Sequence, residues 1–552
     1  FRHFLMEFGI GDRFLLVLIS SAIVYKIFPF SVFVALFSFI VASWIYFQYR
    51  QKQHWHNVGV PGPNTNILFG NTLKQFRTGV IEVDEEMFKK YGNSYGSFLF
   101  ERREFCTKDP KMLRQIFIKE FSHFQNRYNA IPEREHAPKS LMRNILTVLR
   151  DDDWRRVRNR ITPAFTTGKL KKLIPILCES TEKLCKVLET ENALKGKEVP
   201  LKDLFGRFLL DVIGRCGFSL DLDTFDEENI FVKQARTIFD FTRKGQKLRM
   251  ILGVFFPCVS LLYENITGKS FAFAMDEEFF MEMMSDLYEK RRADPEAKEK
   301  YADIFQLLMN AVDDEEFTIS ADDAEIIHSE LRNNEQQQKQ QGKHLTRIEL
   351  FAQSFIILIA GFETTGATLS FAAYMLAIES EIQEKLREEV IDVLGENEMI
   401  TYEHLKRMNY LRAFVQETLR MFPVAPKMNR VCNSDCVING VPFERGDLIT
   451  LPIYVIQHDE AFFPDPFKFD PTRFLPERKA EIDSLAFLTF GLGPRNCIGM
   501  RFAEFQMQVA LALIVRRLRF SPGPNTPKYP PKLLSSEMLR TEQPLVVLAE
   551  KI

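Results

Sequence analysis

Phe490-Gly491-Leu492-Gly493-Pro494-Arg495-Asn496-Cys497-Ile498-Gly499 is a short stretch that presents one cysteine on a glycine-rich loop. Residues after the loop keep apolar side chains at helical spacing and contain no proline, so Cys497 lies near a helix N-terminus, where the dipole favours an anion. Gly493 and Gly499 permit conformations and close approaches that a Cβ would block. Arg495 adds positive charge. The loop indicates a thiolate ligand, against the alternative of a buried, inert cysteine.

The loop matches the pattern Phe-x-x-Gly-x-Arg-x-Cys-x-Gly without departure, and in this it resembles the cytochromes P-450. The resemblance implies a mainly α fold with a small β region and haem b (iron protoporphyrin IX) as the cofactor. Cys497 would be its metal ligand, and Arg495 would reach a haem propionate with its forked guanidinium. Phe490 and Gly499 complete the cofactor-binding loop.

A second motif is Ala360-Gly361-Phe362-Glu363-Thr364-Thr365, where Glu363 is the only charge between Leu350 and Ile378. We reject a membrane span here because an acid at its centre is costly, and we predict a helix through the core. The glycine and hydroxyls suggest that this helix opens locally. In the resembling family this helix crosses the haem, and the implied catalytic residues are Thr364, which hydrogen-bonds O2, and Glu363, which delivers protons through water.

A third motif is Glu417-Thr418-Leu419-Arg420, in a predicted helix from about residue 403 to 421. An arbitrary pair at this spacing is usually a weak surface ion pair. Its position before the cysteine loop resembles that of the family's Glu-x-x-Arg pair. The resemblance implies a buried network of Glu417, Arg420 and Arg473 that holds the cysteine loop against the core.

Four further residues resemble haem-propionate ligands of the family: Trp154, Arg158, Arg127 and Arg430. Trp154 and Arg158 follow three aspartates that suit a helix N-terminus. The alternative for each arginine is an ordinary solvating charge.

The resemblance extends from about Gly59 to the C-terminus and is closest to the microsomal, 3A-like branch that oxidises drugs and steroids. Residues 421–426, 438–440 and 493–503 carry this similarity. Independently, Asn439-Gly440 predicts a type I′ hairpin turn.

The length of the chain alone suggests three or four domains, but no linker able to separate them is present, so we expect one catalytic domain after the anchor. The chain has 552 residues and a net charge of −2, which implies no nucleic-acid partner. Its 8 cysteines are scattered, which argues against zinc and disulfides and for a reducing compartment. No flavin-domain motif occurs, so electrons must come from another protein.

The N-terminal region supplies the predicted location. Ile27–Phe47 is an apolar run of about the twenty residues that a bilayer requires. Arg50 and Lys52 follow it, which favours a cytosolic C-terminal side. We expect a membrane anchor over residues 1–58 and the catalytic domain over 59–552, on the cytosolic face of the endoplasmic reticulum. A cleaved signal peptide is the alternative.

Three points stay open in the sequence. The apolar run at residues 14–25 is either part of the anchor or a separate element. The first residue is Phe1, and Met6 is an alternative start. Residues 313–343 are acidic and then glutamine-rich, which is typical of a surface insertion.

The resemblance implies a monooxygenase that inserts one oxygen atom of O2 into an apolar xenobiotic, steroid or fatty-acid-like substrate. NADPH would act indirectly, through NADPH-cytochrome P450 reductase, and cytochrome b5 is a second candidate donor. A basic surface would steer the acidic reductase; its members are Arg155, Arg156, Arg160, Lys169, Lys171, Lys172 and Arg501. The alternatives are a haem-thiolate isomerase or dehydratase and a haem-binding sensor, and Glu363 with Thr364 argues against both.

Overall fold

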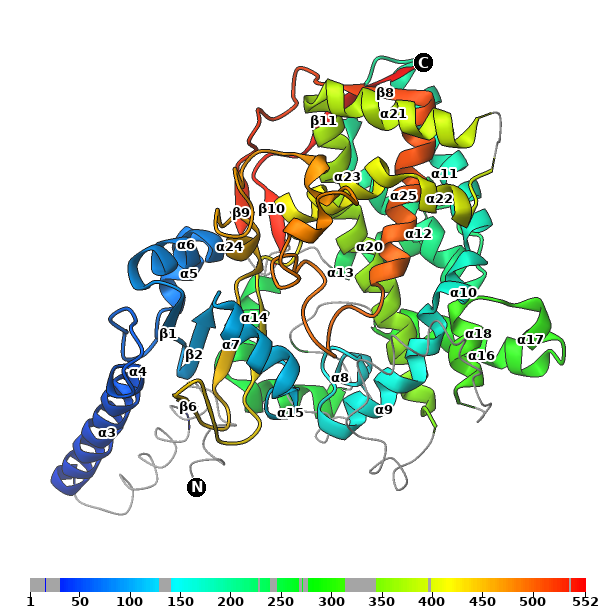
Figure 1. Ribbon diagram of the computed structural model, residues 1–552. Helices are drawn as coiled ribbons and strands as arrows, with labels where there is room; N and C mark the ends of the chain where they lie inside the picture. The colour runs from blue at the N-terminus through cyan, green and yellow to red at the C-terminus, as the bar shows by residue number, and fades with distance from the viewer. Residues whose placement is uncertain are drawn as a thin grey trace. The chain divides into compact units, whose positions relative to one another are not determined.

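The structure is a computed structural model that describes residues 15, 30–128, 140–226, 229–238, 246–267, 271, 277–312, 344–395, 399–535 and 538–552. The chain divides into two compact units. Unit 1 comprises Phe1–Asp151, Thr237–Phe279 and Met428–Pro452, and unit 2 comprises Asp152–Arg236, Phe280–Lys427 and Ile453–Ile552. Figure 1 shows that helices make up most of the chain and that the strands are short. The predicted fold class, mainly α with a small β region, is confirmed.

Unit 2 is built around α20 (Arg347–Ile378), a helix of 32 residues. α12 (Leu201–Phe218) packs along it, and glycines let the two helices approach closely. A Cβ on Gly206 would lie 3.0 Å from the Phe362 ring, and a Cβ on Gly361 would lie 2.8 Å from Ile213 Cδ1. Neighbouring helices cover most of α20, which explains why it is apolar on nearly every face.

The start of α20 is fixed by a capping box. Thr346 Oγ1 accepts a hydrogen bond from Glu349 N at 3.3 Å, and Glu349 Oε2 accepts one from Thr346 N at 2.9 Å. Glu349 is fully buried, and Arg156 of α9 (Asp151–Ile161) donates to both of its carboxylate oxygens, at 2.5 and 3.1 Å. Arg156 therefore holds α9 to the beginning of α20.

Among the described residues, α20 is the helix that is long and apolar enough to cross a membrane, but 61% of its apolar window is buried inside the protein. This burial favours the core helix that the sequence predicts over a membrane span.

The other helices of unit 2 include several that pack directly against α12 or α20 (Figure 1). They are α10 (Thr167–Lys171), α11 (Ile174–Val187), α13 (Ile230–Ile238), α16 (Glu277–Ala293), α17 (Ala297–Lys300), α18 (Ile304–Asn310), α21 (Ser380–Leu394), α22 (Tyr402–Arg407), α23 (Asn409–Met421), α24 (Ile453–Gln457) and α25 (Met500–Arg517). One sheet has the order β3-β11-β8, and β9 pairs with β10. The strands are β3 (Val199–Pro200), β8 (Leu518–Ser521), β9 (Leu533–Ser535), β10 (Leu539–Thr541) and β11 (Val546–Lys551).

Unit 1 contains the sheet β1-β2-β7-β4 and the hairpin β5-β6. The strands are β1 (Ser94–Leu99), β2 (Arg102–Thr107), β4 (Met428–Val431), β5 (Cys436–Ile438), β6 (Val441–Phe443) and β7 (Leu448–Leu451). The helices are α3 (Phe30–Lys52), α4 (His54–Asn57), α5 (Thr72–Thr78), α6 (Val80–Tyr91), α7 (Pro110–Arg114), α8 (Leu141–Asn144), α14 (Gln246–Phe255) and α15 (Pro257–Thr267). Trp55 packs against Gly96 of β1 and donates to Ser97 O at 3.0 Å.

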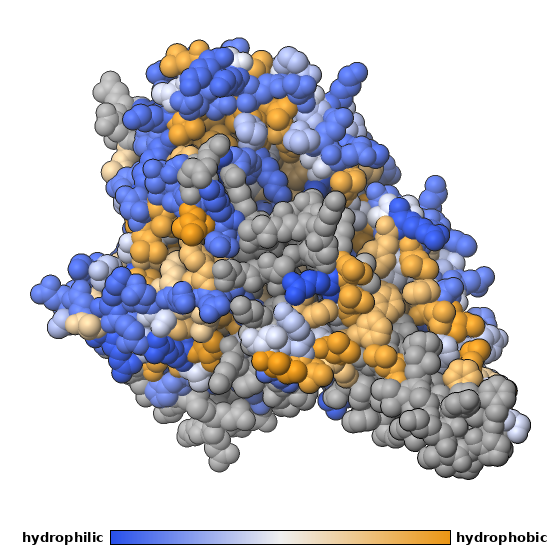
Figure 2. All heavy atoms as spheres, turned by 180° about the vertical axis from the view of Figure 1, so that it is seen from behind, coloured by the Kyte–Doolittle hydropathy of each residue, from blue (hydrophilic) through white to orange (hydrophobic). Residues whose placement is uncertain are grey.

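Helix α3 covers most of the apolar run that predicts an anchor. Near its C-terminal end, Gln48 is buried and donates to Glu101 Oε1 at 2.9 Å, while Lys52 donates to Phe100 O. Upstream, apolar side chains such as Phe39, which is 71% exposed, face outward. Figure 2 shows further apolar surface gathered on one side of the molecule.

Two local predictions have different outcomes. Asn439 and Gly440 have φ values of 48° and 83° and join β5 to β6, which confirms the type I′ hairpin. The single helix over 403–421 is wrong, because α22 ends at Arg407 and α23 begins at Asn409. The carboxylate of Glu389 accepts hydrogen bonds from Tyr410 N and Leu411 N, at 2.7 and 2.8 Å, and so caps the second helix.

The 14–25 run, apart from residue 15, and the 313–343 insertion lie outside the described residues.

Candidate active site

The cysteine loop leads directly into α25, as the sequence predicts. Gly491 and Gly493 have φ values of 86° and 74°, in the region that favours glycine. The loop folds back on itself, because Cys497 N donates to Phe490 O at 2.8 Å and Asn496 N donates to Gly493 O at 3.0 Å. The Cys497 side chain is exposed.

Gly499 leaves room for a close approach, as expected, but its backbone conformation does not require glycine. It is the N-cap of α25 with an ordinary φ of −87°, so no unusual backbone conformation requires glycine there. A Cβ built on Gly499 would have no atom within 4 Å. The space beside the residue is open, and a flat group can approach the loop closely there.

Three predicted haem-binding residues of unit 2 meet at this loop. The Arg495 guanidinium lies 4.8 Å from the ring centroid of Trp154, and both side chains are buried. Arg158, one turn further along α9, donates to Asn496 O at 3.1 Å and to Asn496 Oδ1 at 3.0 Å. Arg158 therefore holds the loop next to the cysteine, a contact that the sequence does not reveal.

The two remaining arginines come together in unit 1. Asn126 and Val431 form an antiparallel bridge in which Val431 N donates to Asn126 O at 2.8 Å. Continued by one residue, this register places Arg127 across from Arg430, which is fully buried. Two guanidinium groups on neighbouring backbone segments form a donor set that can bind a carboxylate.

One face of α20 is open. Ala360 and Thr364, one helical turn apart, are exposed, although most residues of this helix are buried. Thr364 Oγ1 donates to Ala360 O at 2.6 Å. The expected local opening of the helix is wrong: α20 continues without interruption, and the threonine hydroxyl binds the carbonyl one turn back.

These features fit a flat, dianionic macrocycle that binds its metal through one thiolate. Unit 2 supplies an exposed cysteine, a glycine beside open space and an arginine stacked on tryptophan, and α25, which follows the cysteine loop, packs against α20.

Comparison with known proteins agrees with this geometry. The family model described as Cytochrome P450 matches residues 60–549. This chain belongs to the cytochrome P450 family. It is a P450 monooxygenase, an oxidoreductase with haem bound through a cysteine thiolate.

Relatives from mammals match nearly the whole length of this P450. Cytochrome P450 3A41 of Mus musculus is 33% identical over 507 residues, which cover 91% of this chain and 93% of the relative. Cytochrome P450 3A6 of Oryctolagus cuniculus is 34% identical over 494 residues, 89% and 91% of the two chains. Cytochrome P450 3A5 of Homo sapiens is 33% identical over 503 residues, 90% and 93%.

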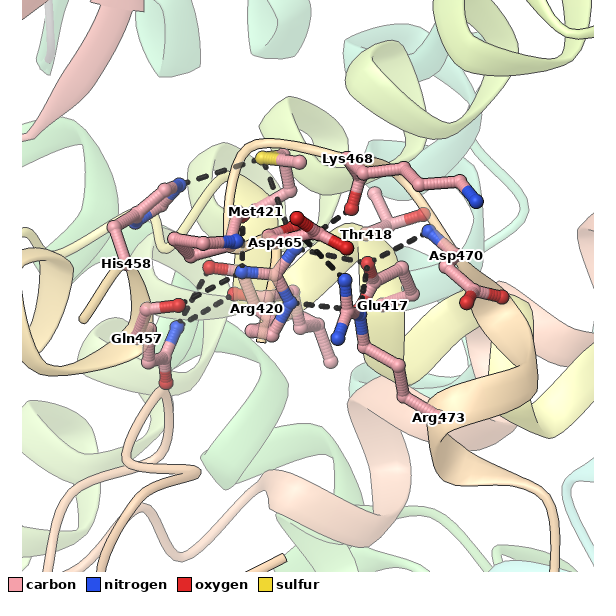
Figure 3. A network of polar contacts seen from close by, with 12 residues as sticks. Glu417, Thr418, Arg420, Met421, Gln457, His458, Asp465, Lys468, Asp470 and Arg473 are labelled. Carbon is pink, nitrogen blue, oxygen red and sulfur yellow. Dashed lines mark hydrogen bonds and ion pairs between the residues drawn. The ribbon is translucent and has the colours of Figure 1, made fainter. Parts of the chain in front are cut away.

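The predicted Glu-Arg-Arg network of this P450 is confirmed and is buried (Figure 3). Arg420 Nε and Nη2 donate to the two Glu417 oxygens at 2.7 and 2.8 Å, and Arg473 Nε lies 3.5 Å from Glu417 Oε1. Arg420 Nη1 also donates to Gln457 O and Pro466 O, at 2.7 and 2.8 Å. Burial raises the pKa of Glu417, and the hydrogen bonds from Arg420 oppose that rise.

Gln457, which the sequence analysis missed, connects this network to the cysteine loop. Its amide nitrogen donates to Leu419 O and Arg420 O, at 3.2 and 2.9 Å. Its Oε1 accepts from Leu488 N at 2.8 Å and from Thr489 Oγ1 at 3.0 Å, immediately before Phe490. A glutamine that ends the apolar run Ile453–Ile456 is the signal that would have pointed to it.

We predict that Arg420→Met prevents accumulation of folded, haem-containing protein. The change leaves the buried Glu417 carboxylate without its main partner, which costs about 3–5 kcal/mol in buried ion pairs. The measurements are thermal unfolding and haem content. Arg478→Met is the matched control, because Arg478 has a side chain that is 42% exposed and pairs with Glu481 at the surface. Equal stability of the two variants would contradict the role assigned to Arg420.

Proposed function

We propose that Cys497 is the axial haem ligand and that this P450 inserts one oxygen atom of O2 into an apolar organic substrate, with electrons from NADPH through a reductase. The observation that carries the proposal is the exposed Cys497 thiol on a loop held by Arg158 and by the buried Arg420 network. A rigid loop fixes the distance between the sulfur and the metal, which a thiolate ligand requires.

Each group around the loop has a separate task in this proposal. Arg495 and Trp154 bind a haem propionate, with Arg158 fixing the loop beside them, and Arg127 and Arg430 are proposed as further propionate ligands. Phe490 and Gly499 form the surface on which the macrocycle lies. Bound haem supplies an iron that activates O2, with the thiolate favouring O–O cleavage.

The side chains on α20 position O2 and move protons. Thr364 is exposed on the open face, where its hydroxyl donates to Ala360 O. If the hydroxyl turns away from that carbonyl, it can hydrogen-bond O2 instead. Glu363 supplies protons to that side of the helix. Apolar neighbours such as Ala360 and Ile356 line the same face and favour an apolar substrate.

Helix α3 is the proposed membrane anchor, in the predicted domain 1–58, with the catalytic domain 59–552 on the cytosolic face of the endoplasmic reticulum. The support is its apolar sequence, its outward-facing apolar side chains and the basic Arg50 and Lys52 at its end.

The proposed redox partner is an acidic flavoprotein, NADPH-cytochrome P450 reductase, with cytochrome b5 as a second donor. α9 contacts the cysteine loop through Arg158, so basic residues near it lie close to the haem ligand. Exposed Lys172 and the part-exposed Arg155 and Lys169 suit this surface. Arg156 does not, because its guanidinium is bound to the buried Glu349.

Cys497→Ala tests whether Cys497 is the axial ligand of the haem iron. Reduced wild-type protein exposed to carbon monoxide should show the red-shifted Soret band of a thiolate-ligated haem, and the variant should lack it. Cys436→Ala, which removes another partly exposed thiol, should keep the band. Persistence of the band in Cys497→Ala would overturn the assignment.

Thr364→Ala tests the proposed role of the Thr364 hydroxyl in proton transfer. The variant should keep haem and substrate binding but divert electrons from product to hydrogen peroxide, because the hydroxyl that assists proton transfer is missing. Product and peroxide per NADPH are measured. Ser370→Ala removes a hydroxyl that makes the same bond one turn back, to Gly366 O at 2.7 Å, from a buried position on the same helix. If the two variants form equal amounts of product per NADPH, the role proposed for Thr364 is wrong.

Charge reversal tests reductase docking. Lys172→Glu should slow reductase-supported turnover, and the difference from wild type should shrink as salt screens the charge. Peroxide-driven turnover should be unchanged. Lys186→Glu is the control, because Lys186 lies in the last turn of α11, away from Lys172, which precedes this helix. Arg156→Glu should instead lower the stability of the folded protein, because it breaks the ion pair between Arg156 and the buried Glu349. Loss of both activities in Lys172→Glu would exclude a docking role.

A further inference from the structure

Two free thiols come together in the loop between β4 and β5 of unit 1. Cys432 directly follows β4, Cys436 is the first residue of β5, and three residues separate them. Neither cysteine is in a disulfide, and their side chains hydrogen-bond each other. The two sulfur atoms are therefore neighbours in the reduced protein.

Backbone hydrogen bonds hold both ends of this loop against one later segment of the chain. Cys432 N donates to Asp447 O, and Gly446 N donates to Cys432 O, both at 2.8 Å. Cys436 pairs with Phe443 in the β5-β6 hairpin. Because one short segment anchors both cysteines, the backbone keeps the two thiols near each other.

The two thiols differ in exposure and in acidity. Cys432 is fully buried, and its Sγ donates to Ser434 O at 3.0 Å. Cys436 is partly exposed, so a small polar molecule reaches it first. Burial raises the pKa of both thiols, and the hydrogen bond with Cys432 opposes that rise at Cys436. Since the thiolate is the nucleophile, Cys436 is better suited to react first.

The second thiol decides what oxidation does to the first. A lone cysteine that is oxidised to the sulfenic acid can be oxidised further to acids that ordinary reductants do not reverse. A neighbouring thiol instead condenses with the sulfenic acid to a disulfide. Hydrogen peroxide is the relevant oxidant, because it forms on an enzyme that reduces O2 whenever two electrons and two protons leave as peroxide and no oxygen atom reaches a substrate.

We propose that Cys432 and Cys436 form a reversible oxidation site that reacts with hydrogen peroxide. The Cys436 thiolate attacks one peroxide oxygen and the O–O bond breaks, which leaves Cys436 sulfenic acid and a hydroxide that takes up a proton to become water. The Cys432 sulfur then attacks the Cys436 sulfur, the S–O bond breaks, and a second water leaves with the thiol proton. Two thiols are oxidised to one disulfide, and one peroxide is reduced to two waters.

The proposed disulfide is a transient modification. In a reducing compartment such disulfides are usually redox-sensing and not structural, and small cellular thiols reverse them by thiol–disulfide exchange. Because both thiols have raised pKa values, little thiolate is present at neutral pH, and the site should respond to sustained exposure to peroxide. The proposal does not depend on which residue ligates the haem iron.

The central test is peptide mass spectrometry of the haem-containing protein after treatment with a series of hydrogen peroxide concentrations. Free thiols are alkylated with iodoacetamide, and trypsin then cuts after Arg430 and Arg445, which gives one peptide that contains Cys432, Cys436 and no other cysteine. In the wild type this peptide should lose two hydrogen atoms and escape alkylation. Dithiothreitol should restore two thiols that can be alkylated.

Single variants test the separate parts assigned to the two cysteines. In Cys432→Ser the partly exposed Cys436 reacts alone, so its peptide should gain oxygen atoms, and dimedone should trap the sulfenic acid. In Cys436→Ser the buried Cys432 should stay available for alkylation after unfolding. Cys258→Ser removes another partly exposed thiol of unit 1 and is the matched control, in which the Cys432–Cys436 disulfide should form as in the wild type.

Three results would overturn the proposal. The first is that both thiols of the wild-type peptide can still be alkylated at every peroxide concentration up to the one that bleaches the haem. The second is that the wild-type peptide gains oxygen atoms without losing hydrogen atoms. The third is that Cys436 forms its disulfide with a cysteine other than Cys432.

Discussion

A guanidinium that is sealed from water needs an acceptor for its N–H groups, and Arg420 finds acceptors on several segments of unit 2. It binds the Glu417 carboxylate on its own helix and the carbonyls of Gln457 and Pro466 on later parts of the chain. Desolvation makes such a charge expensive unless every partner is present. The network therefore forms only when these segments have reached their native positions, and the cysteine loop is one of the parts that this requirement positions.

The connection from Arg420 to Cys497 is short and consists of hydrogen bonds to backbone groups. Gln457 accepts from Leu488 N, and Arg158 donates to Asn496 O, so the loop is fixed just before Phe490 and again at the residue before Cys497. Bonds to main-chain atoms constrain the path of the loop more tightly than side-chain contacts alone. This rigidity explains how a surface loop with two left-handed glycines can present its thiol in one orientation.

The sequence predicted those features that depend on local chemistry or on a fixed pattern. The Asn439-Gly440 turn follows from the conformations of its own two residues, and the long helix follows from an apolar run with a single acid. The break at Met408 was missed because its cause, the Glu389 carboxylate that caps α23, lies about twenty residues away in sequence. Gln457 was missed for the same reason, because it acts through partners that only the tertiary structure brings near.

The basic residues beside the cysteine loop show why charge counts from sequence mislead. Arg155 and Arg156 are neighbours with the same formal charge, yet only Arg156 reaches the buried Glu349 that caps α20. A helix places adjacent residues on different faces, so one arginine remains at the surface and the other joins the core.

Glu363 and Thr364 differ in the same way on α20. The threonine lies on the open face and the glutamate points towards α12 and β10. Adjacent residues of one uninterrupted helix therefore present a hydroxyl on one side and an ion-paired carboxylate on another.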